Sequence, residues 1–175
     1  MKVITTRFGE LEVQESELFQ IPEGILGFES LKDFFFVDPN DQTLILWLQS
    51  KDEAALAFPV IEPKIFNPEY SLKLLPLELE SLELEDLKDA SVYCILTIPK
   101  QVTEMSANLK APLIINNKTK KGRQIVLQDS KLEVKYPIYT ELKKYIVNYT
   151  STQNKKSMPA VLPKNKMSKE KESNA

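Results

Sequence analysis

Four basic side chains are crowded around one glycine in the string SANLKAPLIINNKTKKGRQIVLQ, which spans residues 106–128. They are Lys118, Lys120, Lys121 and Arg123, and the glycine is Gly122. Such a cluster suits a nucleic-acid-binding loop, a phosphate-binding turn or the solvated tip of a β-hairpin. No aromatic residue lies between Tyr93 and Tyr136 to stack on nucleic-acid bases. The pattern therefore favours a hairpin tip, and contact with a protein partner stays open.

Carboxylates form two dense groups that could, in principle, supply acid-base chemistry. One group contains Glu78, Glu80, Glu83, Glu85, Asp86 and Asp89, and the other contains Glu10, Glu12, Glu15 and Glu17. Paired catalytic carboxylates need burial in an apolar pocket, whereas these alternate with leucines and are expected to face water. They indicate either an ordinary solvated face or a negative surface that attracts a basic partner or repels RNA.

The composition removes most other catalytic and cofactor chemistry. Histidine is absent and Cys94 is the single cysteine, which excludes Ser-His-Asp and Cys-His nucleophiles and a zinc site of thiolates and imidazoles. The four glycines form neither a dinucleotide-binding nor a P-loop motif. We therefore predict a protein that is not an enzyme and that holds no metal and no cofactor.

Charge divides the chain into two parts. Residues 1–146 carry 17 basic and 23 acidic side chains, whereas residues 147–175 carry six lysines and two glutamates. An acidic domain is a poor ligand for a phosphate backbone, so no direct nucleic-acid binding is expected. The basic segment 147–175 has few large apolar residues, and we predict that it is disordered. No apolar run approaches the roughly 18 residues of a membrane span and no signal peptide is evident, so a cytoplasmic location is expected.

Short apolar segments separated by Pro, Gly, Asn and Asp predict the elements that position these side chains. We expect a hairpin turn at residues 38–41, a strand at 55–63 that its prolines confine to an edge or a strand end, and a half-buried strand in YSLKLL (residues 70–75). Ser81 is expected to cap a short acidic helix that ends near residue 89. In the basic hairpin, Asn116, Asn117 and Gly122 are expected to supply the positive φ angles.

Many short strands with little helix predict a mainly β protein. We expect residues 1–146 to form a small antiparallel β-barrel-like domain with one or two short helices, the second beginning at Tyr139. The consecutive residues Phe34, Phe35 and Phe36 would place aromatic rings on both faces of one strand. Closure of the sheet would remove exposed edges from a domain with this many strands.

The order of several motifs resembles the FliW family of bacterial flagellar assembly factors. FGELEV, IPEGILGFESLKDF, AFPVIEP and LTIP are followed by the 106–128 string, and the order and spacing hold over about residues 3–146. The string NLKAPLIIN (residues 108–116), followed by Gly122 and QIVL (residues 124–127), is the most specific part. The resemblance implies a non-catalytic β-barrel protein, and it does not cover the basic segment.

The resemblance also implies partner switching between two proteins. Members of the family bind newly made flagellin in the cytoplasm and also bind the RNA-binding translational regulator CsrA, away from its RNA-binding face. Flagellin that accumulates captures the assembly factor and leaves CsrA free to repress flagellin translation. For this chain, flagellin and CsrA are therefore the expected partners, with a monomer when free. The alternative is a single-strand RNA-binding barrel that uses the basic turn and the basic segment.

Rigid or polar positions in the matched string and two aromatic residues are our predicted partner-binding residues. The aromatic residues adjoin Gly or Pro, and aromatic anchors dominate interface energetics. The predicted set is Phe28, Phe58, Asn108, Lys110, Pro112, Asn116 and Arg123.

Overall fold

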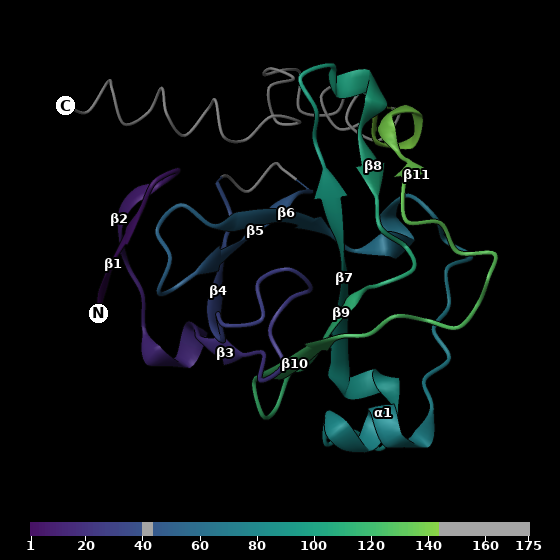
Figure 1. The fold of residues 1–175 in the computed structure, drawn as a ribbon, viewed down its shortest axis with the longest axis horizontal. Coiled ribbons are helices and arrows are strands. Elements are labelled where there is room, and N and C mark those ends of the chain that lie inside the picture. Colours follow the sequence, from purple (N-terminus) through teal and green to yellow (C-terminus); the bar gives the residue numbers. More distant parts are fainter. Residues whose placement is uncertain (40–43, 144–175) are drawn as a thin grey trace.

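Seven strands close into a barrel (Figure 1). In order around the barrel these are β3 (Phe19–Gln20), β4 (Asp33–Val37), β5 (Leu46–Ser50), β6 (Ala57–Ile61), β7 (Ala90–Thr97), β9 (Leu113–Asn116) and β10 (Lys121–Gln124). β10 closes the ring by pairing in parallel with β3, and the other neighbours pair antiparallel. The computed structural model describes residues 1–39 and 44–143. The predicted mainly β barrel is confirmed, with one parallel pairing in an otherwise antiparallel ring.

Smaller elements surround the barrel. The hairpin of β1 (Lys2–Thr5) and β2 (Gly9–Glu12) is a separate sheet, and β8 (Ser106–Ala107) and β11 (Tyr136–Pro137) extend outward from β7. One α-helix, α1, spans Pro76–Ser81, and residues 139–143 are also helical. Single 3-10 turns occur at η1 (Glu15–Glu17), η2 (Pro63–Ile65), η3 (Leu87–Asp89) and η4 (Val102–Glu104). The predicted disorder of residues 147–175 and half of the turn predicted at 38–41 fall outside the described residues.

The strict alternation of side chains in β4 supplies two core clusters at once. Phe34 packs inside the barrel with Leu48 and Val60, while Phe35 packs on the other face with Trp47 beneath the β1–β2 hairpin. Both faces of the Phe34–Phe36 strand are therefore covered within the chain, and Phe34 and Phe35 are almost inaccessible to solvent. Because period-two alternation sends neighbours to opposite faces, one strand can join two layers of core.

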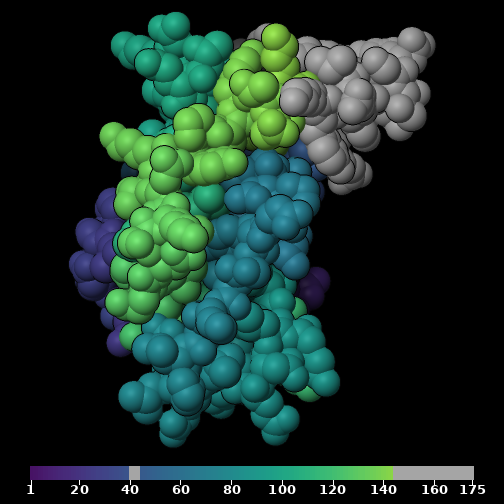
Figure 2. All heavy atoms as spheres, turned by 90° about the vertical axis from the view of Figure 1, so that its right-hand side faces the viewer, coloured from purple at the N-terminus to yellow at the C-terminus, as the bar shows by residue number. Residues whose placement is uncertain are grey.

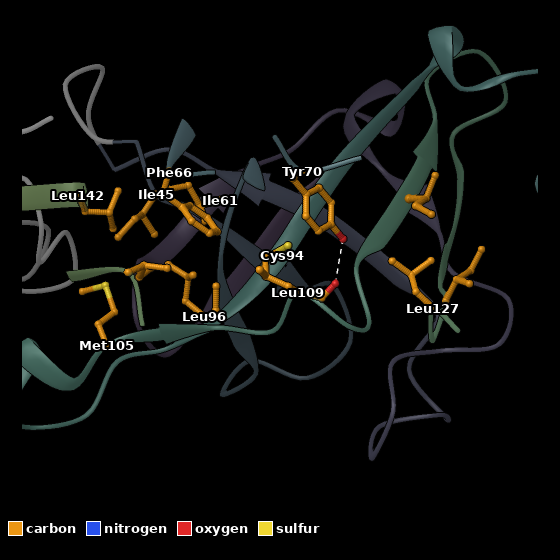
Figure 3. Packing of buried hydrophobic residues seen from close by; sticks show 14 of the residues in the cluster. Ile45, Ile61, Phe66, Tyr70, Cys94, Leu96, Met105, Leu109, Leu127 and Leu142 are labelled. Carbon is orange, nitrogen blue, oxygen red and sulfur yellow. Dashed lines mark hydrogen bonds between the residues drawn. The ribbon is translucent and has the colours of Figure 1, made fainter. Parts of the chain in front are cut away.

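A third core cluster lies on the outer side of β7 (Figure 3). Cys94 and Leu96 point into it from β7, and the hydroxyl of Tyr70 donates a hydrogen bond of 2.9 Å to the carbonyl oxygen of Leu109. Burial raises the pKa of the Cys94 thiol to about 12, so this cysteine is a neutral core side chain at physiological pH. The long connections between the strands cover this cluster.

Two prolines shorten the ladder between β6 and β7. Those strands pair only through Val60 with Ile95 and Ile61 with Cys94. Continuing this register would place Pro59 and Pro63 at the next two hydrogen-bonding positions, and proline has no N–H to donate. Of the two positions predicted for this strand, the edge is wrong, because β6 lies between β5 and β7, and only Pro63 lies beyond the strand end. The prolines instead limit how far its neighbour can pair.

The acidic helix begins earlier than the sequence pattern predicted. Pro76 is its first residue, and the backbone N–H of Leu75 donates to the Glu78 carboxylate, so the helix start does not need Ser81 as a cap. Ser81 is the last helical residue rather than the cap. Glu83, two residues after the last helical residue, has a φ of 57°, a left-handed conformation that is common just beyond a helix end.

Asn116 joins the basic hairpin to the acidic bend that follows α1. Its side chain is buried, with its Nδ2 donating to the carbonyl oxygens of Leu82 and Glu83 at 2.9 and 3.1 Å. Its Oδ1 accepts from the N–H groups of Lys118 and Thr119 in the turn. The amide of Asn116 thus satisfies backbone groups of two segments that are far apart in the sequence.

The positive φ in this turn belongs to Lys120, not to the residues predicted for it. Lys120 has a φ of 62°, and its N–H donates to the carbonyl oxygen of Asn116 at 2.9 Å. Gly122 is required for a different reason. A Cβ there would lie 3.1 Å from the Cγ1 of Ile115 and 3.2 Å from the carbonyl oxygen of Ile114. The glycine therefore permits close packing of β10 on β9.

Replacing Asn116 by alanine should lower the free energy of unfolding by about 2–4 kcal/mol, since four backbone groups lose a partner in a buried site. Asn117→Ala is the matched control, because the Asn117 side chain accepts one exposed hydrogen bond from Ser91 and should cost under about 1 kcal/mol. Urea unfolding followed by circular dichroism measures both. Equal losses in the two variants would contradict the role given to Asn116.

Candidate partner-binding surface

The basic turn and the acidic stretch that first suggested chemistry are ion-paired with each other. The Nζ of Lys121 lies 2.8 Å from the Glu83 carboxylate, and that of Lys118 lies 3.4 Å from the Asp89 carboxylate. Each of these side chains is at least 40% exposed, so each pair contributes modestly to stability. The pairing nevertheless brings opposite charges together, which removes much of the positive potential that a phosphate backbone would need.

An irregular loop, residues 21–31, closes one opening of the barrel. The side chains of Ile25 and Leu31 pack on the inner core cluster, and the N–H of Phe28 donates to the carbonyl oxygen of Ile25 at 2.7 Å. Gly24 and Gly27 have φ angles of 71° and 90°, which favour glycine. At Gly24 a Cβ would lie 2.6 Å from the Cα of Glu29, so the chain crosses itself too closely for any side chain.

This folding of loop 21–31 exposes apolar side chains to solvent. Leu26, Phe28 and Val126 are 59%, 40% and 45% exposed, although they are large hydrophobic residues. The N–H of Leu26 donates to the side-chain oxygen of Gln124 at 2.9 Å, which holds the loop against the end of β10. The ring of Phe28 packs edge-on against Phe58, with 5.3 Å between centroids.

A charged pair borders these apolar side chains. The Nε of Arg123 lies 2.6 Å from the Glu23 carboxylate, and its Nη1 donates to the hydroxyl of Ser81 at 2.9 Å. We call Leu26, Phe28 and Val126, with Glu23 and Arg123 beside them, the loop 21–31 face. Exposed apolar residues bordered by polar ones are typical of protein interaction sites. This face is the candidate functional site.

Three of the seven predicted partner-binding residues, Phe28, Phe58 and Arg123, occur at or beside this face. Lys110 lies in a loop that connects to it, because Gln124 also donates to the carbonyl oxygen of Ala111, the next residue. Asn108 and Pro112 belong to the same loop. The Asn108 side chain accepts from the N–H groups of Lys110 and Ala111, at 3.0 Å each, and Pro112 is buried.

Asn116 lies at the acidic bend that follows α1, where it bonds Leu82, the residue after the Ser81 that Arg123 bonds. Both amide groups of Asn116, and the side-chain oxygen of Asn108, are already bonded within the chain. We therefore interpret both as residues that shape the surface. Partner contact by any of the seven stays a prediction.

Sequence reasoning did not identify Leu26 and Val126 as surface residues. Val126 lies between Ile125 and Leu127, which are both buried. Side chains in the run IVL (residues 125–127) therefore alternate between buried and exposed, as in a strand. This alternation is the sequence signal that could have identified Val126 as an exposed apolar residue. Leu26 lies between two glycine-containing turns, where no periodicity assigns a side chain to a face.

The fold and this face define a small closed β-barrel protein with an exposed apolar surface beside a charged pair. Among residues 1–39 and 44–143, no group of three or more His, Cys, Asp or Glu side chains is arranged to hold a metal ion. Within the same residues, no helix is long and apolar enough to cross a membrane.

Comparison with known proteins identifies the family. The family model described as "FliW protein" matches residues 2–138. The flagellar assembly factor FliW of Bdellovibrio bacteriovorus is 41% identical over 148 residues, which are 84% of each chain. That of Alkaliphilus metalliredigens is 38% identical over 141 residues, covering 80% of this chain and 87% of the relative. A crystal structure of the flagellar assembly factor FliW superposes with a TM-score of 0.74 at 32% identity, covering 79% of this chain and 97% of that one. The chain belongs to the FliW family of flagellar assembly factors.

The two loop glycines provide a matched test of how the face is built. Gly27→Ala carries only the strain of a positive φ, about 1–2 kcal/mol, because nothing lies within 4 Å of a Cβ at that position. Gly24→Ala adds a backbone collision and should cost at least about 2 kcal/mol more. Urea unfolding of the two variants measures the difference. Similar stabilities would contradict the close crossing at Gly24.

Proposed function

We propose that this protein is a cytoplasmic flagellar assembly factor that binds flagellin and the translational regulator CsrA in exchange for one another. Its membership of the FliW family, over the whole barrel including loop 21–31, is the observation that carries this proposal. Binding of flagellin leaves CsrA free to repress flagellin translation, and release of flagellin lets the assembly factor bind CsrA. The protein thereby couples flagellin synthesis to filament assembly.

This function requires binding surfaces and no catalytic group. The loop 21–31 face offers apolar area on a backbone that is pinned by Gln124 and by the Glu23–Arg123 pair. A pre-ordered surface loses little conformational entropy on binding, which favours affinity. We therefore propose a non-enzymatic protein that acts as a monomer when free, with Phe28 as an anchor at this face.

Net charge supports the proposed antagonism toward an RNA-binding partner. Residues 1–146 carry six more acidic than basic side chains. A negative domain bound beside an RNA-binding protein raises the electrostatic cost of bringing phosphates close to it. Antagonism of this kind does not require the assembly factor to occupy the RNA site itself.

The alternative, an RNA-binding barrel that uses the basic turn, receives less support. Lys118 and Lys121 are paired with Asp89 and Glu83, and Arg123 is paired with Glu23. RNA would have to compete with these intramolecular carboxylates for the same cations. A gel shift with single-stranded RNA at low and high salt separates the two proposals, since the binding predicted by the alternative falls steeply with salt.

Truncation of the exposed anchor tests the proposed face. Phe28→Ser should weaken binding to purified flagellin or to CsrA by at least about tenfold, because truncation of an aromatic anchor costs about 1.4 kcal/mol or more. Isothermal titration calorimetry with each partner measures this effect.

Ile4→Ser is the matched control, since Ile4 is an exposed hydrophobic residue of β1 and lies outside the face. It should leave both affinities unchanged. Failure of the unaltered chain to bind either partner would reject the proposed function. If Phe28→Ser binds both partners as tightly as the unaltered chain does, only the proposed face is rejected.

A further inference from the structure

The edge of β7 that faces β6 is only partly paired. The N–H of Asn117 donates to the carbonyl oxygen of Asp89, and that of Asn108 donates to Ile95, both at 3.0 Å. Odd-numbered backbone groups of this strand therefore point toward β9 and β8, so even-numbered ones point toward β6. The β6 ladder stops at Ile61, opposite Cys94. The N–H of Val92 therefore has no acceptor in the described part of the chain.

A second unpaired segment lies nearby. The strand predicted at residues 70–75 is wrong, because the segment forms no strand in the structure. Its side chains still alternate, with Leu72 and Leu74 half-buried on the outer core cluster and Ser71 and Lys73 exposed. It has no strand partner, and among the described residues no hydrogen bond reaches the N–H groups of residues 71–74. Figure 2 shows this part of the chain on the surface of the molecule. It has the pattern of a strand without the neighbour that a strand requires.

A groove of about 440 Å³ separates these two unpaired edges. Ala90, Ser91 and Val92 line one side, and Tyr70, Ser71 and Leu72 line another. Leu87 adds apolar surface, while Glu62 and Lys64 place one charge of each sign at the groove. A segment bound in this groove would therefore meet unpaired backbone groups on both sides and apolar side chains. The charged side chains that line the groove cancel, so they select for no particular charge on the bound segment.

We propose that this groove binds an extended segment of unassembled flagellin as an added β-strand, hydrogen-bonded to Val92 on one side and to the alternate backbone groups of residues 71–74 that face it on the other. Strand addition to an open sheet edge draws its affinity from main-chain hydrogen bonds and its selectivity from alternate side chains. A newly made chain offers extended backbone with unpaired groups, whereas the backbone of a folded regulator is already paired. The identity of this occupant rests on the proposed function, and the groove itself does not.

Amide hydrogen exchange, read residue by residue by NMR, tests the strand directly. In the free protein the Val92 amide should exchange much faster than those of Ser91 and Tyr93, which face β9 and serve as internal controls. Saturating purified flagellin should slow exchange at Val92 and at alternate amides of residues 71–74 by at least about tenfold and leave the two controls unchanged. Unchanged exchange at Val92 in a saturated complex would overturn the proposal.

Filling the groove gives a second, independent test. Ser71→Trp places a large ring at an exposed position that lines the groove, and it should weaken flagellin binding at least about tenfold. Ser16→Trp, at an exposed serine of η1 outside the groove, is the matched control and should bind normally. Urea midpoints of both variants verify that the fold is retained.

The outcomes separate the groove from the function. If the unaltered chain binds neither flagellin nor CsrA, the proposed function and the assigned occupant fail together. If it binds flagellin while Ser71→Trp retains full affinity, the groove inference fails and the function stands. If Ser71→Trp weakens only CsrA binding, the occupant is the regulator, and the assignment to flagellin is overturned.

Discussion

The alternating orientation of β7 is the constraint on which the rest of the structure depends. Its odd-numbered backbone groups bond to β9 and β8, while its even-numbered groups face β6. The same alternation sends Tyr93 and Ile95 into the barrel and Cys94 and Leu96 into the outer core cluster. A shift of one residue would exchange these two sets. Barrel closure, the outer core and the open edge beside β6 therefore follow from one register.

How much of this could be predicted from the sequence depends on whether a local rule or a distant contact decides the outcome. Strand alternation predicted the mainly β fold and the two faces of Phe34–Phe36, because period two is a property of the backbone itself. The same alternation predicted a strand at residues 70–75 that does not form, because no neighbouring strand pairs with it. The left-handed residue of the basic turn could not be predicted, since Asn116 is fixed by its hydrogen bonds to Leu82 and Glu83, more than 30 residues away. The apolar residues of the loop 21–31 face escaped prediction for the same reason. Their exposure depends on how two glycines fold the loop over the barrel.

Two surfaces with different physics emerge from this arrangement. The loop 21–31 face is a pre-ordered apolar patch with a charged border, suited to side-chain anchoring of a partner. The groove beside β7 offers unpaired backbone, suited to an extended chain. Both involve segments that pack on β7, β9 or β10, so occupation of one surface can alter the other through the shared sheet. Coupling between two sites in this way makes binding of two proteins mutually unfavourable without requiring that they overlap.

Exchange of partners is the central claim, and the mass of the complexes tests it most directly. The unaltered chain, flagellin and CsrA, mixed at equal concentrations above both dissociation constants, can be examined by native mass spectrometry. The account predicts complexes of this chain with flagellin and complexes with CsrA, with each titrated partner displacing the other. An abundant assembly containing all three proteins, stable as either partner is raised, would contradict it.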